Sequence, residues 1–496
     1  MIFNRPFSRI MLSLYSGMIM GVSYPPGVGF FALFGLVPLI RVWLISSPLT
    51  SLKYSFISSL ICSLISLYWI GLNSGASIIP VLISLIAAIL YLSIYWAIIG
   101  YFISWLQKRF SRTIYLIPFI WVSMEFLKSY GPLAFSWSSL ALTQTNFLPL
   151  LQIAEYTGSE GISFWVVLIN IAIYMMFYNN KQIYKLNIVL IFFIISPFIY
   201  GLFKINFLKE SQWNKRTVSI IQPNIDPNLK WESSFRDELY RTMDSLNVLA
   251  YELSPDLVLW PEAALPNYMR VSYVRKRYEK IAVDKSIPLM MGTLDYKTKD
   301  GARLSLNGSI YFDGSDKNKM YHKLFLVPFA EYIPMSKHFS ILKKLNFGQG
   351  NFIQGNEYSL FKLDSLLFSN LICYDLSNPL VVKNFIIKGA RFLTVQANVA
   401  WLQNSSGVRQ FFEIAKLRAV ENRTGIAISA NTGISGIINP LGVATHKILF
   451  NKQEVIKGEV FLNNKVTFYS KYGNVFSKIC FLFIILCFVF VKLKRI

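Results

Sequence analysis

Three short segments in the second half of the chain each bring a charged or reactive side chain to the end of an apolar run. A carboxylate, Glu262, follows the run Leu-Val-Leu-Trp-Pro, and a thiol, Cys373, follows Asn-Leu-Ile. Between them, Lys323 and Glu331 bracket the run Leu-Phe-Leu-Val-Pro-Phe-Ala. Each segment alone has an ordinary explanation: a solvated loop carboxylate, an edge strand with charged ends, and a small buried cysteine. Together they contain the groups that a cysteine nucleophile needs.

A thiolate nucleophile requires a base that takes its proton and a cation or N–H donors that stabilise the developing oxyanion. Histidine is the usual base, but the three histidines, His322, His338 and His446, stand in no recognisable catalytic setting. Glu262 is therefore the available base, and Lys323 is the available cation. The sequence contains no metal-ligand spacing and no glycine-rich phosphate loop, so it predicts neither a metal nor another cofactor.

The elements that must position these side chains belong to an α/β pattern between about residues 212 and 468, where short apolar runs alternate with amphipathic stretches. Helices are predicted at 235–253 and 407–423. Strands are predicted at 217–222, 257–260, 288–292, 309–313, 371–374, 392–396, 426–430 and 436–439. Glu262 falls just past the carboxyl end of one strand, where α/β sheets build their sites. Cys373 falls on a turn after another strand, which would hold it rigidly and open to substrate.

The rest of the chain is a membrane pattern. Hydrophobic residues make up 54% of the chain, and the mean hydropathy is +0.44. Apolar stretches long enough to span a bilayer, about 17–25 residues, lie at 8–24, 27–46, 54–72, 79–106, 112–128, 161–178, 187–205 and 474–491. The net charge of +23 is not a nucleic-acid signature, because the basic residues before Glu125, the first acidic residue, cluster between apolar runs. We predict a polytopic protein with eight spans and no nucleic-acid partner.

The basic clusters also predict the orientation. They comprise Arg5 and Arg9, Arg41 and Lys53, Lys108, Arg109 and Arg112, Lys181 and Lys185, and Lys492, Lys494 and Arg495. The connections 24–27 and 73–78 carry no charge. By the positive-inside rule both termini are cytoplasmic, and the long segment between spans seven and eight lies outside. The predicted domains are a transmembrane bundle at 1–206, an outer catalytic domain at 207–470, and an eighth helix with a basic tail at 471–496.

Ionisable residues near the outer end of the fifth span invite a functional hypothesis. Glu125 and Lys128 lie one helical turn apart, and the simpler interpretation is an interfacial pair. The following segment, 129–160, is rich in Trp, Phe, Leu and Gly and is predicted to be a loop lying partly in the interface, where a lipid could enter. The three cysteines other than Cys373 lie in apolar runs, where small buried side chains are expected: Cys62, Cys480 and Cys487.

At the three segments described first, the chain resembles the nitrilase, or carbon–nitrogen hydrolase, superfamily. Trp-Pro-Glu262, Lys323 with Glu331 behind it, and Cys373-Tyr374 are similar to that superfamily's signatures and follow its order. The resemblance implies a four-layer α-β-β-α sandwich. It also implies that Glu262, Lys323 and Cys373 form a catalytic triad.

Within the superfamily, several spans before the domain and one after it resemble the apolipoprotein N-acyltransferases. Gln222 to Trp231 is similar to the stretch that leads to an important tryptophan in that group, and Glu331 is similar to its accessory glutamate. Further residues that the resemblance assigns to the site are Asn307, Tyr374, Asn398 and Trp401, and the stretch 418–423 is similar to a characteristic helix.

Two residues depart from that group's pattern. Asp375 stands where a glutamate is usual after Cys-Tyr, one methylene shorter, so a secondary role could be weakened while the nucleophile is unaffected. Val399 stands where an aspartate is usual after Asn398, which changes the polar contacts expected of that loop.

The resemblance implies a two-step acyl transfer in the bacterial inner membrane, with the catalytic domain in the periplasm. Glu262 would deprotonate Cys373, which would take an acyl chain from a phospholipid, expected to be phosphatidylethanolamine, as a thioester. Lys323 and a backbone amide near Tyr374 would stabilise the oxyanion. The α-amine of the diacylglyceryl-cysteine of an apolipoprotein would then accept the chain, which completes lipoprotein maturation. The expected partners are these two substrates and membrane lipid.

Two alternatives remain open at this point. A membrane-tethered nitrilase-type amidase would hydrolyse the thioester with water, although a soluble amide substrate does not require eight spans. A non-enzymatic membrane binding protein, such as a transporter with an inert triad, would be expected to show internal repeats, which the spans lack. The apolar residues after Lys323 are either walls of a dry site or simply core: Leu324, Phe325 and Phe329.

Overall fold

A computed structural model describes residues 6–178, 183–208, 213–269, 272–299, 301–315, 319–334, 351–463 and 465–493. The chain forms two compact units. Unit 1 comprises residues 1–71, 82–208 and 472–496, and unit 2 comprises residues 72–81 and 209–471. The segment 72–81, which the sequence predicts within the membrane part, therefore belongs to unit 2. Several residues named above lie outside the described ranges: Arg5, Lys181, His338, Lys494 and Arg495.

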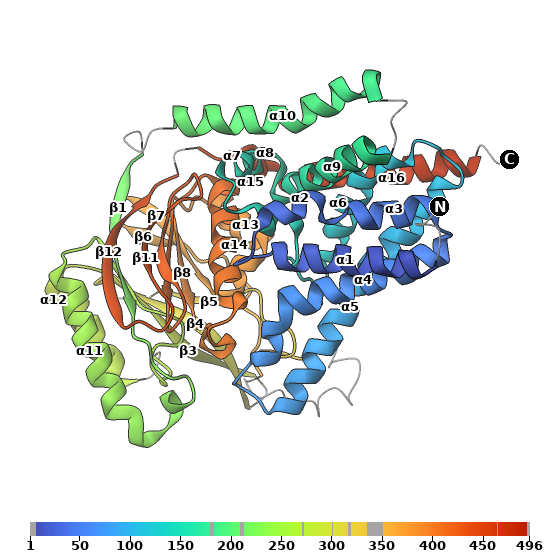
Figure 1. Cartoon of the computed structure of the whole chain (residues 1–496). Helices are drawn as coiled ribbons and strands as arrows, with labels where there is room; N and C mark the ends of the chain where they lie inside the picture. The colour runs from blue at the N-terminus through green and yellow to red at the C-terminus, as the bar shows by residue number, and fades with distance from the viewer. Residues whose placement is uncertain are drawn as a thin grey trace. The chain divides into compact units, whose positions relative to one another are not determined.

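Unit 1 is helical (Figure 1). Its helices are α1 (Pro6–Ser23), α2 (Ala32–Gly35), α3 (Val37–Ile45), α4 (Pro48–Leu67), α5 (Ile78–Gln107, which begins in unit 2), α6 (Ile117–Lys128), α7 (Leu148–Leu151), α8 (Ala154–Thr157), α9 (Ser159–Tyr178), α10 (Ile183–Phe207) and α16 (Val475–Leu493). Prolines near the first turn mark the starts of α3, α4 and α6, where a missing N–H costs no helical hydrogen bond.

Among the described residues, 5 helices are long and apolar enough to cross a membrane. They are Pro48–Leu72, which includes α4, then α5, α9, Leu190–Phe207 of α10, and α16. The other predicted spans also contain helices, but the second is broken into α2 and α3, and the fifth is the 12-residue α6. The structure thus supports a bundle of apolar helices, and the count of eight spans stays a prediction.

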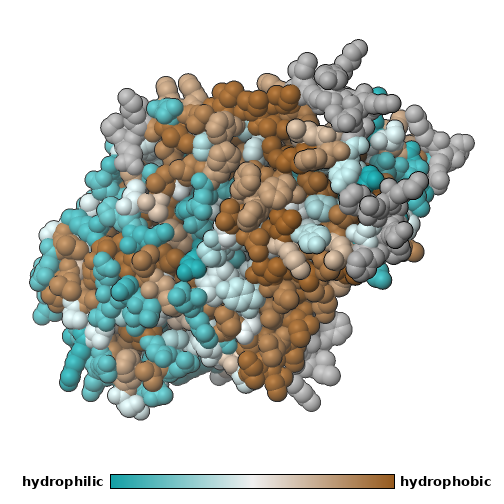
Figure 2. Space-filling view, viewed as in Figure 1, coloured by the Kyte–Doolittle hydropathy of each residue, from teal (hydrophilic) through white to brown (hydrophobic). Residues whose placement is uncertain are grey.

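The surface of unit 1 is unusually apolar for a protein in water. On α10, Phe192 and Ile199 are more than half exposed, and on α16 the same holds for Ile479 and Phe490. Figure 2 shows apolar side chains, in brown, over much of the visible surface of the helical unit. Because contiguous apolar surface on this scale marks contact with lipid or protein, unit 1 has the surface expected of a membrane-embedded bundle.

Glu125 and Lys128 are buried and bind the segment that follows α6. The Glu125 carboxylate accepts hydrogen bonds from Trp121 Nε1 (3.1 Å), Leu140 N (2.9 Å) and Ser139 Oγ (3.1 Å). Lys128 Nζ donates to Ser138 Oγ at 2.8 Å. Both charges therefore also hold the segment that follows α6, and an interfacial position of the pair stays a prediction.

Unit 2 is built on two six-stranded sheets, with orders β12-β1-β2-β3-β4-β5 and β11-β10-β9-β8-β7-β6. The first sheet contains β1 (Lys215–Gln222), β2 (Leu257–Leu259), β3 (Leu289–Lys299), β4 (Ala302–Phe312), β5 (Lys319–His322) and β12 (Glu454–Phe461). The second contains β6 (Phe361–Leu363), β7 (Leu366–Ile372), β8 (Leu393–Ala397), β9 (Ile426–Ala430), β10 (Ser435–Ile438) and β11 (Ala444–Ile448). The helices are α11 (Arg236–Glu252), α12 (Tyr273–Lys285), α13 (Pro379–Ile387), α14 (Ser406–Asn422) and α15 (Phe468–Tyr472).

The two sheets lie face to face. Gln396 Nε2 on β8 donates to the main-chain oxygen of Trp260 at 2.8 Å, and Ser429 Oγ on β9 donates to that of Ile221 at 2.7 Å. Helices α11 and α12 cover one outer side, and α13 and α14 cover the other (Figure 1). This is the α-β-β-α layering that the resemblance implies.

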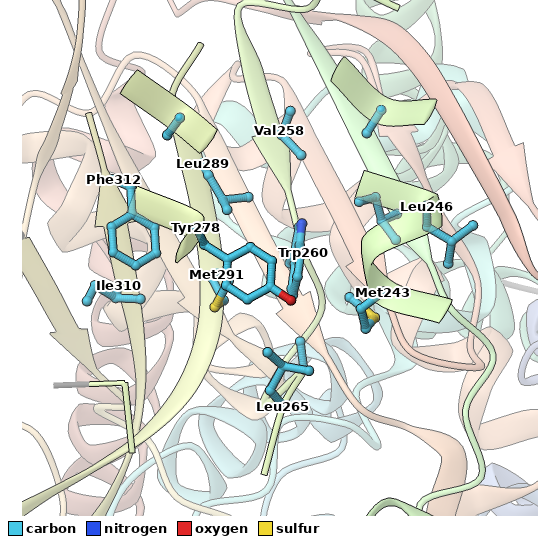
Figure 3. Close-up of a cluster of buried hydrophobic side chains, with 14 of the residues drawn as sticks. Met243, Leu246, Val258, Trp260, Leu265, Tyr278, Leu289, Met291, Ile310 and Phe312 are labelled. Atoms are coloured by element: carbon cyan, nitrogen blue, oxygen red, sulfur yellow. The ribbon is translucent and has the colours of Figure 1, made fainter. Parts of the chain in front are cut away.

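The core between the first sheet and its helices is a single apolar cluster (Figure 3). Alternate residues of the strands, such as Val258 and Trp260, point into it and meet Leu246 of α11 and Tyr278 of α12. The Trp260 and Tyr278 rings are 4.9 Å apart in an edge-to-face arrangement, and Trp260 Nε1 donates to Asn247 Oδ1 at 2.9 Å. This packing holds the end of β2 rigidly, directly before Glu262.

All eight predicted strands and both predicted helices of unit 2 are present, with ends shifted by a few residues. The apolar run after Lys323 is different, because the edge strand β5 ends at His322, before the run begins. Residues 324–330 form a loop closed by a bridge between Pro328 and Tyr332. The interpretation of this run as an edge strand with charged ends is therefore wrong.

Candidate active site

The candidate site forms where strands of both sheets end. β2 and β5 run in the same direction, because two antiparallel pairings separate β3 from β5 while β2 and β3 are parallel. Their carboxyl ends therefore lie at the same edge, which carries Glu262 and Lys323. In the second sheet, β7 and β8 are parallel, and their ends carry Cys373 and Asn398.

Glu262 is the centre of the polar cluster. Its Oε1 accepts a hydrogen bond from Asn307 Nδ2 at 2.7 Å and lies 3.5 Å from Lys323 Nζ. Its Oε2 accepts from the Asn398 main-chain N–H at 2.7 Å. The backbone behind it is crowded: a Cβ on Gly292 would lie 2.3 Å from the Pro261 oxygen. Only glycine fits there, so the sheet presses directly against the turn that carries the carboxylate.

Lys323 is 1% exposed and lies between two carboxylates. Its Nζ is 2.8 Å from Glu331 Oε1 and 3.5 Å from Glu262 Oε1. Burial acts to lower the pKa of Lys323, but Glu331 and Glu262 outweigh it, so the pKa is raised above its ordinary value. Lys323 is therefore a permanent cation in this site.

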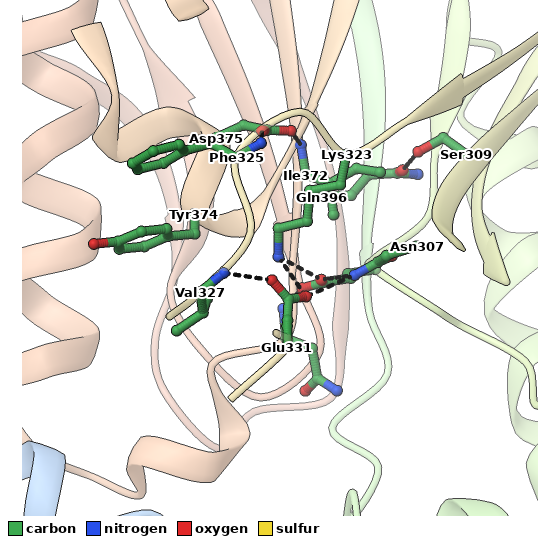
Figure 4. Close-up of polar contacts among 12 residues, drawn as sticks. Asn307, Ser309, Lys323, Phe325, Val327, Glu331, Ile372, Tyr374, Asp375 and Gln396 are labelled. Carbon is green, nitrogen blue, oxygen red and sulfur yellow. Dashed lines mark hydrogen bonds and ion pairs between the residues drawn. The ribbon is translucent and has the colours of Figure 1, made fainter. Parts of the chain in front are cut away.

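Glu331 completes the cluster from the loop that follows Lys323 (Figure 4). Its Oε1 also accepts from Asn307 Nδ2 at 3.2 Å, and its Oε2 accepts from the Val327 N–H at 2.8 Å. The Glu331 carboxylate therefore closes the loop 324–330 through its hydrogen bond from Val327. Asn307, which the resemblance assigns to the site, is the amide that both carboxylates share.

Cys373 stands at the start of a short 3-10 helix (Cys373–Ser377), with φ +46. Its side chain is partly exposed, and the thiol is free of any disulfide. Burial raises the pKa of Cys373 well above its usual value; Glu262 also raises it, while Lys323 and a main-chain hydrogen bond from Asn398 lower it. The cysteine therefore rests as a thiol, and it needs a base beside it to become a nucleophile.

Asp375 is fully buried and joins the cysteine turn to the lysine loop. Oδ1 accepts from the N–H groups of Leu324 (3.1 Å) and Phe325 (2.7 Å), and Oδ2 accepts from Tyr321 OH (2.7 Å) and the Ile372 N–H (3.0 Å). Burial raises the pKa of Asp375 to about 6, opposed by Lys323 and by these hydrogen bonds. The shorter carboxylate has four donors, so its structural role is complete despite the departure from the expected glutamate.

Aromatic side chains cover the turn. The Phe325 and Tyr374 rings are stacked at 5.1 Å with an interplanar angle of 5° (Figure 4). Leu324 and Tyr374 are buried, whereas Phe325 and Phe329 are half-buried. Leu324 is therefore core, and Phe325 is available as a wall of the site.

Two predicted tryptophans lie apart from the hydrogen-bonded cluster that the described residues form around Glu262. Trp231 is 51% exposed, on a 3-10 turn (Leu229–Trp231). The Trp401 carbonyl accepts from the Ser74 N–H at 3.1 Å, in the loop that begins at Asn398. Asn398 itself is held by Asn431, whose Nδ2 donates to its Oδ1 at 3.3 Å.

Two further residues of the site are not predicted from the sequence: Lys230, which is buried beside the Glu262 turn, and Tyr321, which binds Asp375. A lysine in a polar loop next to a tryptophan carries no sequence signal of burial. His322 Nε2 lies 2.7 Å from the buried Asp295 Oδ2. Among the described residues, no group of three or more His, Cys, Asp or Glu could hold a metal ion.

Comparisons with known proteins cover both units. The family model described as carbon-nitrogen hydrolase matches residues 217–464, and that described as apolipoprotein N-acyltransferase N-terminal domain matches residues 16–172. The apolipoprotein N-acyltransferase of Geobacter metallireducens is 29% identical over 494 residues, covering 96% of this chain and 94% of that protein. That of Chlorobaculum tepidum is 27% identical over 526 residues, covering 96% and 95%. Among solved structures, an amidase from Nesterenkonia sp. AN1 is 19% identical with a TM-score of 0.39, covering 52% of this chain and 93% of that one.

Proposed function

The chain belongs to the carbon–nitrogen hydrolase family, and we propose that it is an apolipoprotein N-acyltransferase. The observation that carries this proposal is a combination. The polar cluster of Glu262, Lys323 and Glu331 is buried in the hydrolase domain and is electrostatically coupled to Cys373, and the first part of the chain matches the N-terminal domain of that acyltransferase. The match of this N-terminal domain also argues against a tethered amidase and against a binding protein with an inert site.

In the proposed reaction, Glu262 takes the proton of the Cys373 thiol. This assignment is supported by the raised pKa of Cys373, which leaves the sulfur protonated until a base acts. The thiolate attacks the sn-1 ester carbonyl of a phospholipid, proposed to be phosphatidylethanolamine. Lys323, a permanent cation with raised pKa, and a main-chain N–H near Tyr374 stabilise the oxyanion.

The first half-reaction ends when the ester C–O bond breaks. The lysophospholipid leaves as an alcohol with the proton from Glu262, and the acyl chain remains on Cys373 as a thioester. The α-amine of the diacylglyceryl-cysteine then attacks the thioester carbon and gives its proton to Glu262. The C–S bond breaks, the thiol regains the proton, and the amide product leaves.

The proposed setting is the bacterial inner membrane, with eight spans, both termini in the cytoplasm and the catalytic domain in the periplasm. The proposed domains are 1–206, 207–470 and 471–496, and the basic clusters between spans support this orientation. A reporter that is active only in the periplasm should be active when fused near Asn356 and silent after Arg112. The opposite pattern would reverse the orientation.

The decisive experiment incubates the purified protein in detergent with phospholipid and a diacylated lipopeptide. We expect an acyl chain on the lipopeptide α-amine and one lysophospholipid for each chain transferred. Release of free fatty acid without transfer would instead identify an amidase-like hydrolase. No chemistry with either substrate would leave only a binding function.

A further inference from the structure

Lys230 is a buried cation at the turn that carries Glu262. It is 3% exposed, and its ammonium donates a hydrogen bond to the main-chain oxygen of Ala263. Ala263 directly follows Glu262 and has φ +43, in the left-handed region that side chains other than glycine rarely adopt. Lys230 therefore stabilises the left-handed backbone conformation of Ala263, the residue directly after Glu262.

The charges around Glu262 explain why a second cation matters. Glu262 and Glu331 share the Asn307 amide and the Lys323 ammonium. Two buried carboxylates beside one cation disfavour each other's ionised form, because like charges at short range repel strongly where water is excluded. Lys230 adds a second buried ammonium group to a cluster whose carboxylates are Glu262, Glu331 and Asp375.

We infer that Lys230 is a positioning residue: it places a buried positive charge beside Glu262 and holds the turn that orients this carboxylate to take the Cys373 proton. The inference rests on the proposed function of Glu262 as the base. Burial lowers the pKa of Lys230 to about 8, and Glu262 acts in the opposite direction, so the ammonium form dominates at neutral pH. Asp375 and Cys373 are the other titratable groups of the cluster: both act on Lys323, and Cys373 also interacts with Glu262 and Glu331.

Three variants separate charge from hydrogen bonding at this position. Lys230→Met removes both, Lys230→Gln keeps a donor for Ala263, and Lys230→Arg keeps the charge. Lys457→Met is the matched control, because Lys457 also donates to main-chain oxygens, those of Leu253 (2.7 Å) and Ser254 (3.0 Å), in the same unit.

The first measurement is the pH profile of acyl-enzyme formation from phospholipid alone, followed by intact mass. In Lys230→Met and Lys230→Gln, the acidic limb should move to higher pH by about one unit or more, since an opposite charge nearby commonly shifts a carboxyl group by about 1–3 units. Lys230→Arg and Lys457→Met should keep the wild-type limb. A purely structural role would lower the rates uniformly and leave the limb in place, and that result overturns the inference.

A second measurement is independent of acyl transfer. We measure the rate at which iodoacetamide alkylates Cys373 as a function of pH. In Lys230→Met and Lys230→Gln, the inflection at the lowest pH should move to higher pH by the same amount as the acidic limb of acyl-enzyme formation. If the wild type formed no acyl-enzyme, the proposed function would fail, while the alkylation profiles would still decide the role of Lys230. If Lys230→Met does not fold, Lys230→Gln decides, because it removes only the charge.

Discussion

Two regions of the molecule bury opposite charges, and they do so with different partners. In unit 1, Glu125 and Lys128 bind the serines and backbone of the segment 138–140. In unit 2, Glu262, Lys323 and Glu331 bind one another and share Asn307. In both regions, hydrogen bonds and ion pairs offset the free-energy cost of removing the charged groups from water. In unit 2 the charges share their partners and also act on Cys373, the proposed nucleophile, whereas in unit 1 they hold a neighbouring segment through separate hydrogen bonds.

The largest difference between the two regions should appear when each loses a carboxylate charge. Glu262→Gln should slow acyl-enzyme formation by about 10²–10⁴-fold, the usual contribution of a general base. Glu125→Gln should keep the rate within a few-fold while lowering thermal stability, because it weakens hydrogen bonds to Trp121 and Leu140. Single-turnover mass spectrometry measures both rates. A normal rate in Glu262→Gln would move the base elsewhere, with Glu331 the first candidate.

Removing Lys323 or Lys128 should lower the free energy of unfolding by different amounts. Lys323→Met leaves two buried carboxylates without their cation, which should cost about 3–5 kcal/mol of unfolding free energy. Lys128→Met leaves the Ser138 acceptors unpaired and removes a cation near Glu125, whose carboxylate keeps its three hydrogen bonds, so it should cost less, about 1–3 kcal/mol. Denaturation in detergent compares the two variants. Equal losses would mean that the charges near Lys323 are no more coupled than those near Lys128.

Lys323→Arg should fold but lose nearly as much activity as Lys323→Met, because a planar guanidinium cannot replace a compact ammonium between Glu262 and Glu331. An arginine variant with full activity would show that any cation suffices at this position.

Asp375 should make unit 2 sensitive to pH. Its folded pKa is raised from 3.8 to about 6, so the folded state binds the proton more tightly than the unfolded state. Its contribution to the unfolding free energy is therefore greatest at low pH and falls as pH rises from about 4 to about 6, by about 3 kcal/mol at most. Asp375→Asn should flatten this slope, yet cost about 1–3 kcal/mol because four donors then compete for one oxygen. An unchanged slope in Asp375→Asn would assign the pH dependence to another group.

The smallest expected effect concerns the aromatic cover of the cysteine turn. Phe325→Leu removes the stacking on Tyr374 and should cost about 0.5–1.5 kcal/mol beyond its lost area. Because Phe325 is half-buried, part of the effect should appear as a higher KM for phospholipid. A change confined to stability would make Phe325 core rather than a wall of the site.

The sequence predicted the strands that bear the site because apolar runs ending in Trp-Pro-Glu262 or Ile-Cys373 have a strong local pattern. It did not predict β5, β6, β11 and β12, which are short or edge strands with mixed polarity. β12 pairs with the distant β1, whereas β5, β6 and β11 each pair with the adjacent strand β4, β7 or β10 at the edge of a sheet. An edge strand of mixed polarity has a weak local pattern, because its stability comes from the neighbour that it pairs with.

Within the site, too, the sequence predicts individual residues but not how distant segments come together. Glu262, Lys323, Glu331 and Asn307 were predicted individually, and the structure brings them within hydrogen-bonding or ion-pair distance. The burial of Lys230 could not be predicted, because a loop lysine is ordinarily solvated. The four donors to Asp375 come from two separate stretches, residues 321–325 and Ile372, so the hydrogen bonds of this carboxylate could not be predicted without the fold.

The most direct test of the account is the mass of the protein after incubation with phospholipid alone. The central claim is that Cys373 carries the acyl chain, so the wild type should gain the mass of one acyl chain, located at Cys373 by peptide mapping and released by hydroxylamine. Cys373→Ser should gain nothing, because an alcohol beside Glu262 is a far poorer nucleophile than a thiol. An acyl chain on any other residue, or transfer to lipopeptide by Cys373→Ala, would contradict the account.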